Sequence, residues 1–268
     1  MKILITGASG RVGSAIRPYL RSEFDLRLFD LAPPATGPAE GEEVVVGDLA
    51  SVADVREALH GVDAVLHLAC VHGLGLTFEQ SLDANYRAVL VLLQESSSAG
   101  VGRFVYASSH HVLGAYRQAG FDAAGRDVAP DAFYGLGKAF GEAACAMYAR
   151  RFGLRVFTVR IGNADPTVSD GRTLRMWTSA RDLASLFALG LRLEGLEHEV
   201  VYGVSACPDP MFDNARAFTL GYRPQDRAEE NLAPGFRPYG AMPPELGPDW
   251  VGGAYAAAPL PPLAERGR

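Results

Sequence analysis

The chain has 268 residues and a formal net charge of −6, from 31 acidic side chains against 25 Lys and Arg. That balance gives no general attraction to nucleic acid or to an anionic membrane, and no apolar stretch is long enough to cross a bilayer. The three cysteines, Cys70, Cys145 and Cys207, are odd in number and far apart, which favours reduced thiols over disulfides. Because the N-terminus enters an apolar strand at once, we expect no signal peptide and a cytoplasmic protein.

The first predicted element is a buried strand at 2–6, which runs into a glycine-rich turn and then a helix near 11–21. In such a turn the first glycine permits a tight bend, the second lets backbone N–H groups approach a pyrophosphate, and the third lets the helix pack on the strand. The spacing is GxxGxxG rather than GxGxxG, but strand, glycines and helix together predict a dinucleotide site. Its predicted cofactor-binding residues are Gly7, Ser9, Gly10, Arg11, Val12 and Gly13.

A second predicted strand, at 26–29, ends in Asp30. A carboxylate there can accept hydrogen bonds from the ribose hydroxyls of an adenosine, and it would repel a 2′-phosphate, so NAD is favoured over NADP. The next predicted strand, at 43–46, leads to Asp48 and Leu49, which are placed to border an adenine. Asp48 is equally suited to cap the predicted helix at 51–59.

Two more predicted strands, at 63–68 and 102–107, bring further residues to the same edge, because ligands of open parallel sheets bind at the carboxyl ends of the strands. We expect Leu68 and Ala69 beside the cofactor. The later strand ends in Ser108 and Ser109, either of which can hydrogen-bond a substrate oxygen. A Ser-Ser pair at a strand end is otherwise typical of a turn or a helix cap.

Tyr134 and Lys138 lie four residues apart in a predicted helix at 133–152, and therefore on one helical face. A lysine ammonium beside a tyrosine favours the phenolate and lowers the pKa of the phenol towards the working range of a base. This spacing alone is common. Together with the glycine turn and the serine strand, it predicts a proton-transfer site.

Strands continue at 154–159 and 199–202, and helices at 77–99 and 179–193, so strands and amphipathic segments alternate along the chain. This rhythm predicts an α/β fold with a doubly wound, Rossmann-type parallel sheet. We expect a cofactor-binding domain at 1–164 and a small substrate-binding region at 165–268, packed on that domain. From about Asn231 the sequence is rich in Pro, Gly and Ala, which predicts either a strap over the surface, able to reach a neighbouring subunit, or partial disorder.

With Ser, Tyr and Lys following the glycine turn in order, the first 165 or so residues resemble the extended short-chain dehydrogenase/reductase superfamily. The resemblance implies that Ser109, Tyr134 and Lys138 handle a hydroxyl proton while a nicotinamide takes the hydride. It also implies that Asn85 supports a proton-relay water, although Asn85 could simply face a neighbouring helix.

Most of the chain also resembles one subgroup, the uronate dehydrogenases, which oxidise the anomeric carbon of galacturonate or glucuronate with NAD. The matching segments are 78–80, 107–111 with Gly114, 134–138, 141–142, 159–162, Arg172, Trp177 and, less closely, 250–253. The resemblance implies that Ser109 and His111 bind sugar hydroxyls or the carboxylate and that Arg172 anchors the carboxylate. Tyr134 would take the C1 hydroxyl proton, and the product would be an aldarolactone.

Three positions depart from that subgroup. His110 replaces a usual Asn, Asn163 replaces a usual Ser, and the loop that carries His72 is altered and longer by a residue. All three shape the predicted sugar pocket, so a related polyol or aldose acid stays open as the substrate. The three histidines suggest no metal, because hydride transfer needs none and no carboxylate or cysteine completes a ligand set.

Two other functions stay open. A nucleotide-sugar epimerase uses the same Tyr and Lys, although the C-terminal region is short for a nucleotide pocket. A non-catalytic, dinucleotide-sensing regulator is possible on the same fold, although such proteins typically lose the Tyr-Lys pair. We expect a homo-oligomeric enzyme acting on a small sugar acid.

Overall fold

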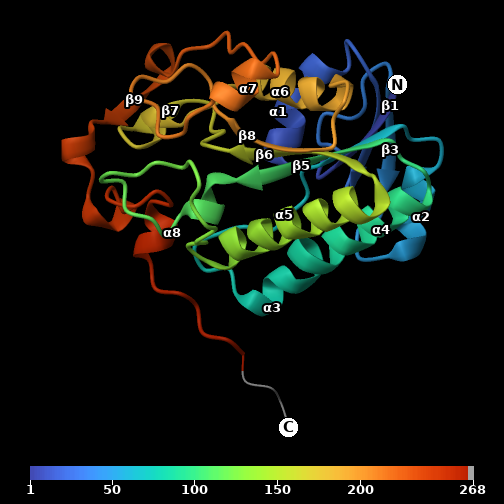
Figure 1. The fold of residues 1–268 in the computed structure, drawn as a ribbon, viewed down its shortest axis with the longest axis horizontal. Helices are drawn as coiled ribbons and strands as arrows, with labels where there is room; N and C mark the ends of the chain where they lie inside the picture. Colours follow the sequence, from blue (N-terminus) through green and yellow to red (C-terminus); the bar gives the residue numbers. More distant parts are fainter. Residues whose placement is uncertain (265–268) are drawn as a thin grey trace.

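The computed structural model describes residues 1–264 and contains a seven-stranded parallel sheet with helices on both faces (Figure 1). The strand order is β3-β2-β1-β4-β5-β6-β8, so the order reverses between β1 and β4. The strands are β1 (Lys2–Thr6), β2 (Asp25–Asp30), β3 (Glu42–Val46), β4 (Ala64–His67), β5 (Arg103–Ser109), β6 (Arg155–Ile161) and β8 (His198–Gly203). The predicted doubly wound fold is confirmed.

Alternate residues of each strand point to opposite faces of the sheet, so each face has its own apolar core. Ile3 and Ile5 of β1 pack under the helices of one face, whereas Leu4 packs under those of the other. The first face carries α1 (Arg11–Leu20), α6 (Ala180–Arg192) and α7 (Ala215–Thr219), and the second carries α2 (Val52–Leu59), α4 (Ala88–Ser98) and α5 (Phe133–Phe152). Fully burying one such side chain contributes about 1.5–3 kcal/mol.

The predicted helix at 77–99 is not continuous, which corrects that expectation. It is divided into α3 (Phe78–Ser81), a π-helical segment (Leu82–Arg87) and α4. A capping box between Thr77 and Gln80 starts α3. Asn85, in the π-helical segment, bonds the backbone of Val71, and this tertiary contact accompanies the wider turn.

Residues beyond 164 are packed on the same sheet, because both α6 and β8 come from that part of the chain. They also contain elements that the sequence did not predict. A two-stranded parallel sheet joins β7 (Val168–Asp170) to β9 (Leu232–Arg237), and α8 (Ala254–Ala257) follows two short 3₁₀ turns, Tyr239–Ala241 and Pro244–Leu246. The Pro/Gly-rich segment is therefore an ordered strap from 232 to 257, packed on its own chain. Residues 265–268 lie outside the described residues.

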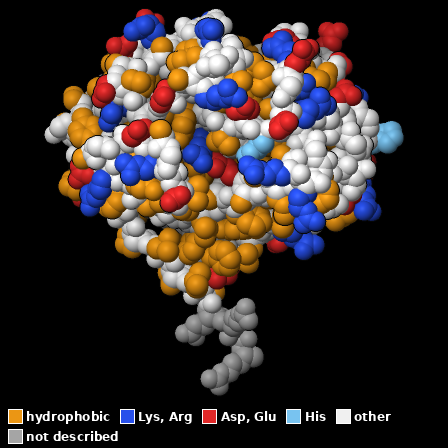
Figure 2. Space-filling view, viewed as in Figure 1, with side chains coloured by type: hydrophobic (Ala, Val, Ile, Leu, Met, Phe, Trp, Pro, Cys, Tyr) orange, Lys and Arg blue, Asp and Glu red, His pale blue; other side chains and the backbone are white. Residues whose placement is uncertain are grey.

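Apolar side chains gather over the lower part of the molecule in Figure 2, where Figure 1 places α3, α4 and α5. Leu90 of α4 and Leu136 and Met147 of α5 are among the exposed large apolar residues. None of the helices within residues 1–264 is long and apolar enough to span a membrane.

Candidate functional site

A cavity of about 820 Å³ opens at the carboxyl ends of the central strands, where the strand order reverses. Such switch points are where open α/β sheets bind their ligands. Its lining includes every residue predicted above to bind cofactor or substrate, so the structure brings these residues together. Among the predicted site residues, only Asn85 does not line it.

The glycine turn forms one end of the cavity. Gly7 has a φ of +71°, and a Cβ there would lie 2.6 Å from the backbone nitrogen of Ala69. A Cβ on Gly13 would lie 2.6 Å from the Gly7 carbonyl oxygen, so both positions require glycine. Gly10 begins α1 without a side-chain cap, and no acidic residue occupies the first turn. The free N–H groups of this helix start fit a pyrophosphate.

Asp30 lies at the end of β2, beside the turn. Its carboxylate accepts hydrogen bonds from the backbone N–H groups of Ser9, at 2.9 Å, and Leu31, at 2.8 Å. These bonds hold the carboxylate at the rim of the cavity, where the ribose of an adenosine would lie. Arg11, the basic residue of the glycine turn, is paired with Asp165, and within residues 1–264 no Lys or Arg pairs with Asp30, which fits NAD rather than NADP.

Asp48 and Leu49 border the same end of the cavity. Ser51, and not Asp48, is the N-cap of α2, because its side chain accepts from the backbone N–H of Asp54. Asp48 instead accepts a hydrogen bond from the N–H of Ala50 within the preceding turn, at 2.8 Å. The predicted capping role of Asp48 is therefore wrong, and its position beside an adenine stays a prediction.

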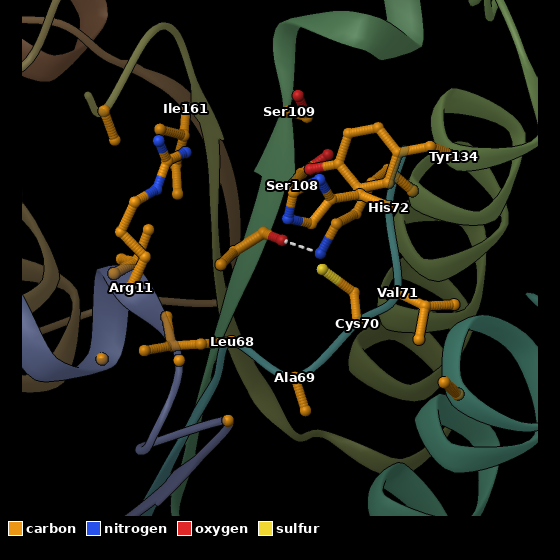
Figure 3. Close-up of a pocket in the computed structure, with 18 of the residues that line it drawn as sticks. Arg11, Leu68, Ala69, Cys70, Val71, His72, Ser108, Ser109, Tyr134 and Ile161 are labelled. Atoms are coloured by element: carbon orange, nitrogen blue, oxygen red, sulfur yellow. Dashed lines mark hydrogen bonds between the residues drawn. The ribbon is translucent and has the colours of Figure 1, made fainter. Parts of the chain in front are cut away.

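Ser109, Tyr134 and Lys138 all line the cavity, and Figure 3 shows Ser109 and Tyr134 on its wall. Lys138 donates to the carbonyl oxygen of Ala107 at 2.6 Å, and its ammonium lies 5.8 Å from the centre of the Tyr134 ring. The Ser108 hydroxyl donates to Glu142 at 2.5 Å, and Glu142 in turn pairs with Arg160. Ser108 is thus committed to a structural network, and the predicted substrate role of Ser109 stays a prediction.

Burial raises the pKa of the Tyr134 phenol above its ordinary value of 10, whereas the Ser109 hydroxyl lowers it. The sequence predicts that Lys138 lowers this pKa towards the working range of a base, but burial raises the pKa of Tyr134 and is the larger effect. The physical reason is that the buried phenolate loses hydration, while the ammonium is engaged with a backbone carbonyl rather than with the phenol oxygen.

Two histidine rings pack against Tyr134 in the cavity. The ring of His72 lies 5.9 Å from that of Tyr134, and the ring of His111 lies 5.4 Å away, both edge-on. His110 lies behind His111 and donates from Nδ1 to the carbonyl oxygen of Ile161 at 3.2 Å. Burial lowers the pKa of all three histidines, so each is neutral at neutral pH unless a partner supplies a proton.

Arg172 forms another part of the cavity wall and is partly buried. Its Nη1 donates to the carbonyl oxygen of Val251 at 2.9 Å, while Nε has no hydrogen-bond partner. A Cβ on Gly253 would lie 2.6 Å from the guanidinium carbon, so the backbone lies directly on the charged group. Arg172 takes part in none of the ion pairs found within residues 1–264. A buried cation of this kind is stabilised when an anion binds beside it.

Two predicted residues make contacts that the sequence did not suggest. The Arg11 side chain forms an ion pair with Asp165, across the cavity from the glycine turn. Asn163 uses its amide within its own loop, because Nδ2 donates to Asp165 at 2.9 Å. Both residues line the cavity, and their proposed roles towards ligands stay predictions.

Asn85 lies next to the cavity without lining it. Its amide donates to and accepts from the backbone of Val71, both at 2.9 Å, and its Cβ is close to Gly137 of α5. The side chain therefore fixes the loop after β4 to the helix that carries Tyr134. The proton-relay water stays a prediction.

Two features of the site were missed in the sequence. Asp131 contacts His111 from behind, and the segment 252–255 closes the cavity through Gly252, Ala254 and Tyr255. The match at 250–253 gave a weak signal for the second feature, whereas nothing marked Asp131 among the other loop carboxylates. Within residues 1–264, no group of three His, Cys, Asp or Glu side chains is arranged to hold a metal ion.

Comparison with known proteins agrees with this geometry. Residues 3–166 match the NAD dependent epimerase/dehydratase family. A uronate dehydrogenase of Pseudomonas putida is 37% identical over 229 residues, 85% of each chain. An NAD-dependent glucose-6-phosphate dehydrogenase of Haloferax volcanii is 33% identical over 85% of this chain and 94% of its own. A crystal structure of a mutant uronate dehydrogenase from Agrobacterium tumefaciens complexed with NAD superimposes with a TM-score of 0.85, at 32% identity over 96% of this chain and 97% of that one.

Proposed function

Since the chain belongs to the NAD dependent epimerase/dehydratase family, we propose that it is an NAD-dependent dehydrogenase that oxidises a free hexuronate at C1 to an aldarolactone. The observation that carries this proposal is Arg172, a partly buried cation that lines the cavity of Tyr134, has a buried Nε without a hydrogen-bond partner and forms no ion pair within residues 1–264. A substrate carboxylate supplies the missing anion, and a guanidinium binds it with two parallel N–H donors. D-galacturonate and D-glucuronate both meet this requirement.

The residues of the cavity divide the work of the reaction. Ser109 orients the C1 hydroxyl, Tyr134 accepts its proton, and Lys138 keeps a positive charge beside the phenol ring. NAD, when bound, supplies the hydride acceptor and a positively charged ring next to this site. The buried phenol of Tyr134 needs such positive charge to act as a base, because burial alone raises its pKa.

The proposal is tested by following NADH formation with purified protein, NAD and a panel of sugars. The panel contains galacturonate, glucuronate, mannuronate, galactose, glucose 6-phosphate and UDP-glucuronate. Turnover of a free uronate, with little or no turnover of galactose, supports both the oxidation and the recognition of a carboxylate. Preference for glucose 6-phosphate would indicate that Arg172 binds a phosphate group rather than a carboxylate. Conversion of UDP-glucuronate without net NADH formation would favour the epimerase alternative. The relatives from Pseudomonas putida and Haloferax volcanii are both named dehydrogenases.

We also infer a cytoplasmic homo-oligomer. The exposed apolar side chains of α4 and α5, including Leu90, Leu136 and Met147, support association through this face. Light scattering on the eluting protein tests it, and a monomeric mass at micromolar concentration would contradict it.

A further inference from the structure

His111 and Asp131 form a close pair behind the substrate end of the cavity. Nδ1 of His111 lies 2.5 Å from Oδ2 of Asp131, and the carboxyl group is fully enclosed. The His111 ring lines the cavity, edge-on to Tyr134, whereas Asp131 does not reach the cavity. The other carboxyl oxygen, Oδ1, has no hydrogen-bond partner. Within residues 1–264, His111 is the cavity-lining side chain that Asp131 hydrogen-bonds, although its charge also acts on Arg172 and Tyr134.

Three glycines from separate parts of the chain enclose this carboxyl group. A Cβ on Gly114 or on Gly252 would overlap Oδ2 of Asp131, and a Cβ on Gly135 would lie 2.8 Å from Oδ1. The turn after β5, the first turn of α5 and the C-terminal strap thus meet around one side chain. The backbone fits so closely that the position of the carboxyl group, and with it the orientation of the imidazole, is fixed.

The number of protons on the pair decides what His111 offers to a ligand. When the pair carries one proton more than a carboxylate and a neutral imidazole, it is either a carboxylic acid beside a neutral imidazole or a carboxylate beside an imidazolium. In both arrangements Nδ1 and Oδ2 share a hydrogen, and Nε2 carries a hydrogen of its own. Without that proton, Nδ1 donates to a carboxylate, Nε2 becomes an acceptor, and the pair has a net charge of −1.

The surroundings set the pH at which this proton leaves. Burial raises the pKa of Asp131 and lowers that of His111, and the positive charge of Arg172 acts on both groups. The titratable and charged groups that face the pair are His72, His110, Tyr134, Arg172 and Tyr255. Because Arg172 stays positive throughout, the pair is the part of this wall whose charge changes near neutral pH.

We propose that Asp131 is a positioning residue whose shared proton makes His111 Nε2 a hydrogen-bond donor to the substrate carboxylate, so that an anionic sugar binds only to the protonated pair. This inference rests on the proposed function, because it names the anion that the donor meets. Loss of the proton removes the donor and places a negative charge beside the carboxylate. Selection of a uronate is thereby linked to proton binding, while a neutral sugar is much less affected.

The test compares the KM for galacturonate across pH in the wild type and in Asp131→Asn, at saturating NAD. In the wild type, KM is constant at low pH and rises by up to about tenfold per pH unit above the apparent pKa of the pair. In Asp131→Asn neither the amide nor the neutral imidazole titrates in this range, so KM no longer changes with pH. A merely structural role for Asp131 would raise KM without removing its pH dependence. A variant that keeps the wild-type profile would overturn the proposal, as would a flat wild-type profile.

A second measurement does not depend on turnover or on the stability of the variant. With ¹⁵N-labelled histidine in the wild-type protein, the Nε2 signal of His111, assigned with His111→Gln, changes from protonated to unprotonated as the pH rises through neutrality. An unprotonated Nε2 at all pH values would overturn the shared proton. If this titration is present but no uronate is oxidised, the result supports the shared proton of His111 and Asp131 and contradicts the proposed substrate. If uronates are oxidised but the titration is absent, the function stands and the inference fails.

Discussion

Thr6 Oγ1 and His67 Nδ1 lie 2.7 Å apart across the pairing of β1 and β4, at directly opposite positions of the central sheet. His67 is fully buried, its ring stacks on Tyr106, and its Nε2 has no hydrogen-bond partner. Burial lowers the pKa of His67 to about 3, and the charge of Lys138 acts in the same direction. The sheet directly below the cavity therefore contains a histidine that is neutral in the folded state.

This histidine predicts a loss of stability in acid. The pKa of His67 is lower in the folded protein than in the unfolded chain, so unfolding takes up a proton below the unfolded pKa of about 6.5. Stability is fully present above that pH and falls by up to about 1.4 kcal/mol per pH unit towards the folded pKa. In His67→Gln, which retains a partner for Thr6, Tm should depend less on pH between about 6.5 and 4.5. Parallel curves of Tm against pH for wild type and variant would show that His67 does not titrate on unfolding.

Tyr134→Phe should abolish turnover while leaving NAD binding nearly unchanged. The phenol oxygen is the proposed proton acceptor, and loss of a general base typically costs about 10²- to 10⁴-fold in rate. The measurement is kcat with a uronate, together with the Kd for NAD. Tyr148→Phe is the matched control, because Tyr148 lies on the same helix and bonds Gln94 away from the cavity. Normal kcat in the Tyr134 variant would remove this residue from the mechanism.

Arg172→Met should raise the KM for a uronate far more than the KM for a neutral sugar. A hydrogen bond to a charged group contributes about 1.5–3 kcal/mol, which corresponds to about 10- to 150-fold in KM. Arg175→Met is the control, since Arg175 bonds Asp209 and Gln118 outside the cavity. Equal increases for both sugars would mean that Arg172 supports the fold of the pocket and does not bind the carboxylate.

Asp30→Ala should weaken NAD binding and reduce the preference for NAD over NADP. The variant loses the acceptor for the ribose hydroxyls and the charge that repels a 2′-phosphate, and it frees the N–H of Ser9. The quantity to measure is the ratio of kcat/KM for the two cofactors. Asp25→Ala, at the exposed opposite end of β2, is the control. If the ratio stays at the wild-type value in both variants, cofactor selection lies elsewhere.

The sequence predicted what depends on local pattern. All seven strands of the main sheet were placed within two residues, because continuous apolar runs bounded by turns are typical of buried parallel strands. The rule that strand ends share one edge predicted the residues that follow the strands, such as Asp30 and Ser109, whereas helical spacing indicated Tyr134 and Lys138. The substrate roles of His111 and Arg172 were implied by the resemblance to uronate dehydrogenases. The sequence did not distinguish Ser108 from Ser109 as the substrate-binding serine, because the hydrogen bond between Ser108 and Glu142 is a contact between distant segments.

What the sequence did not predict depends on contacts between distant segments. The pairing of β7 with β9 joins residues about sixty positions apart, in segments with no apolar alternation. The break in the helix at 82–87 accompanies the bonds between Asn85 and Val71, which no helical periodicity reveals. The enclosed position of Asp131 depends on the packing of Gly114 and Gly252 against its carboxyl group, and these residues are distant in the sequence. Whether the strap also touches a neighbouring subunit stays a prediction.

The strap that places Gly252 and Gly253 on Asp131 and Arg172 also determines when, during synthesis, the site becomes complete. A nascent chain that has emerged as far as Phe152 already carries the glycine turn and the Ser-Tyr-Lys residues. It lacks Arg172, which follows 20 residues later (172 − 152), and the backbone that covers it at Gly252 and Gly253, which follows 100 residues later (252 − 152). Proteolytic removal of the strap would thus leave dinucleotide binding largely in place and abolish sugar oxidation. The loss of a segment near the C-terminus would therefore inactivate a site whose Ser-Tyr-Lys residues lie in the middle of the chain.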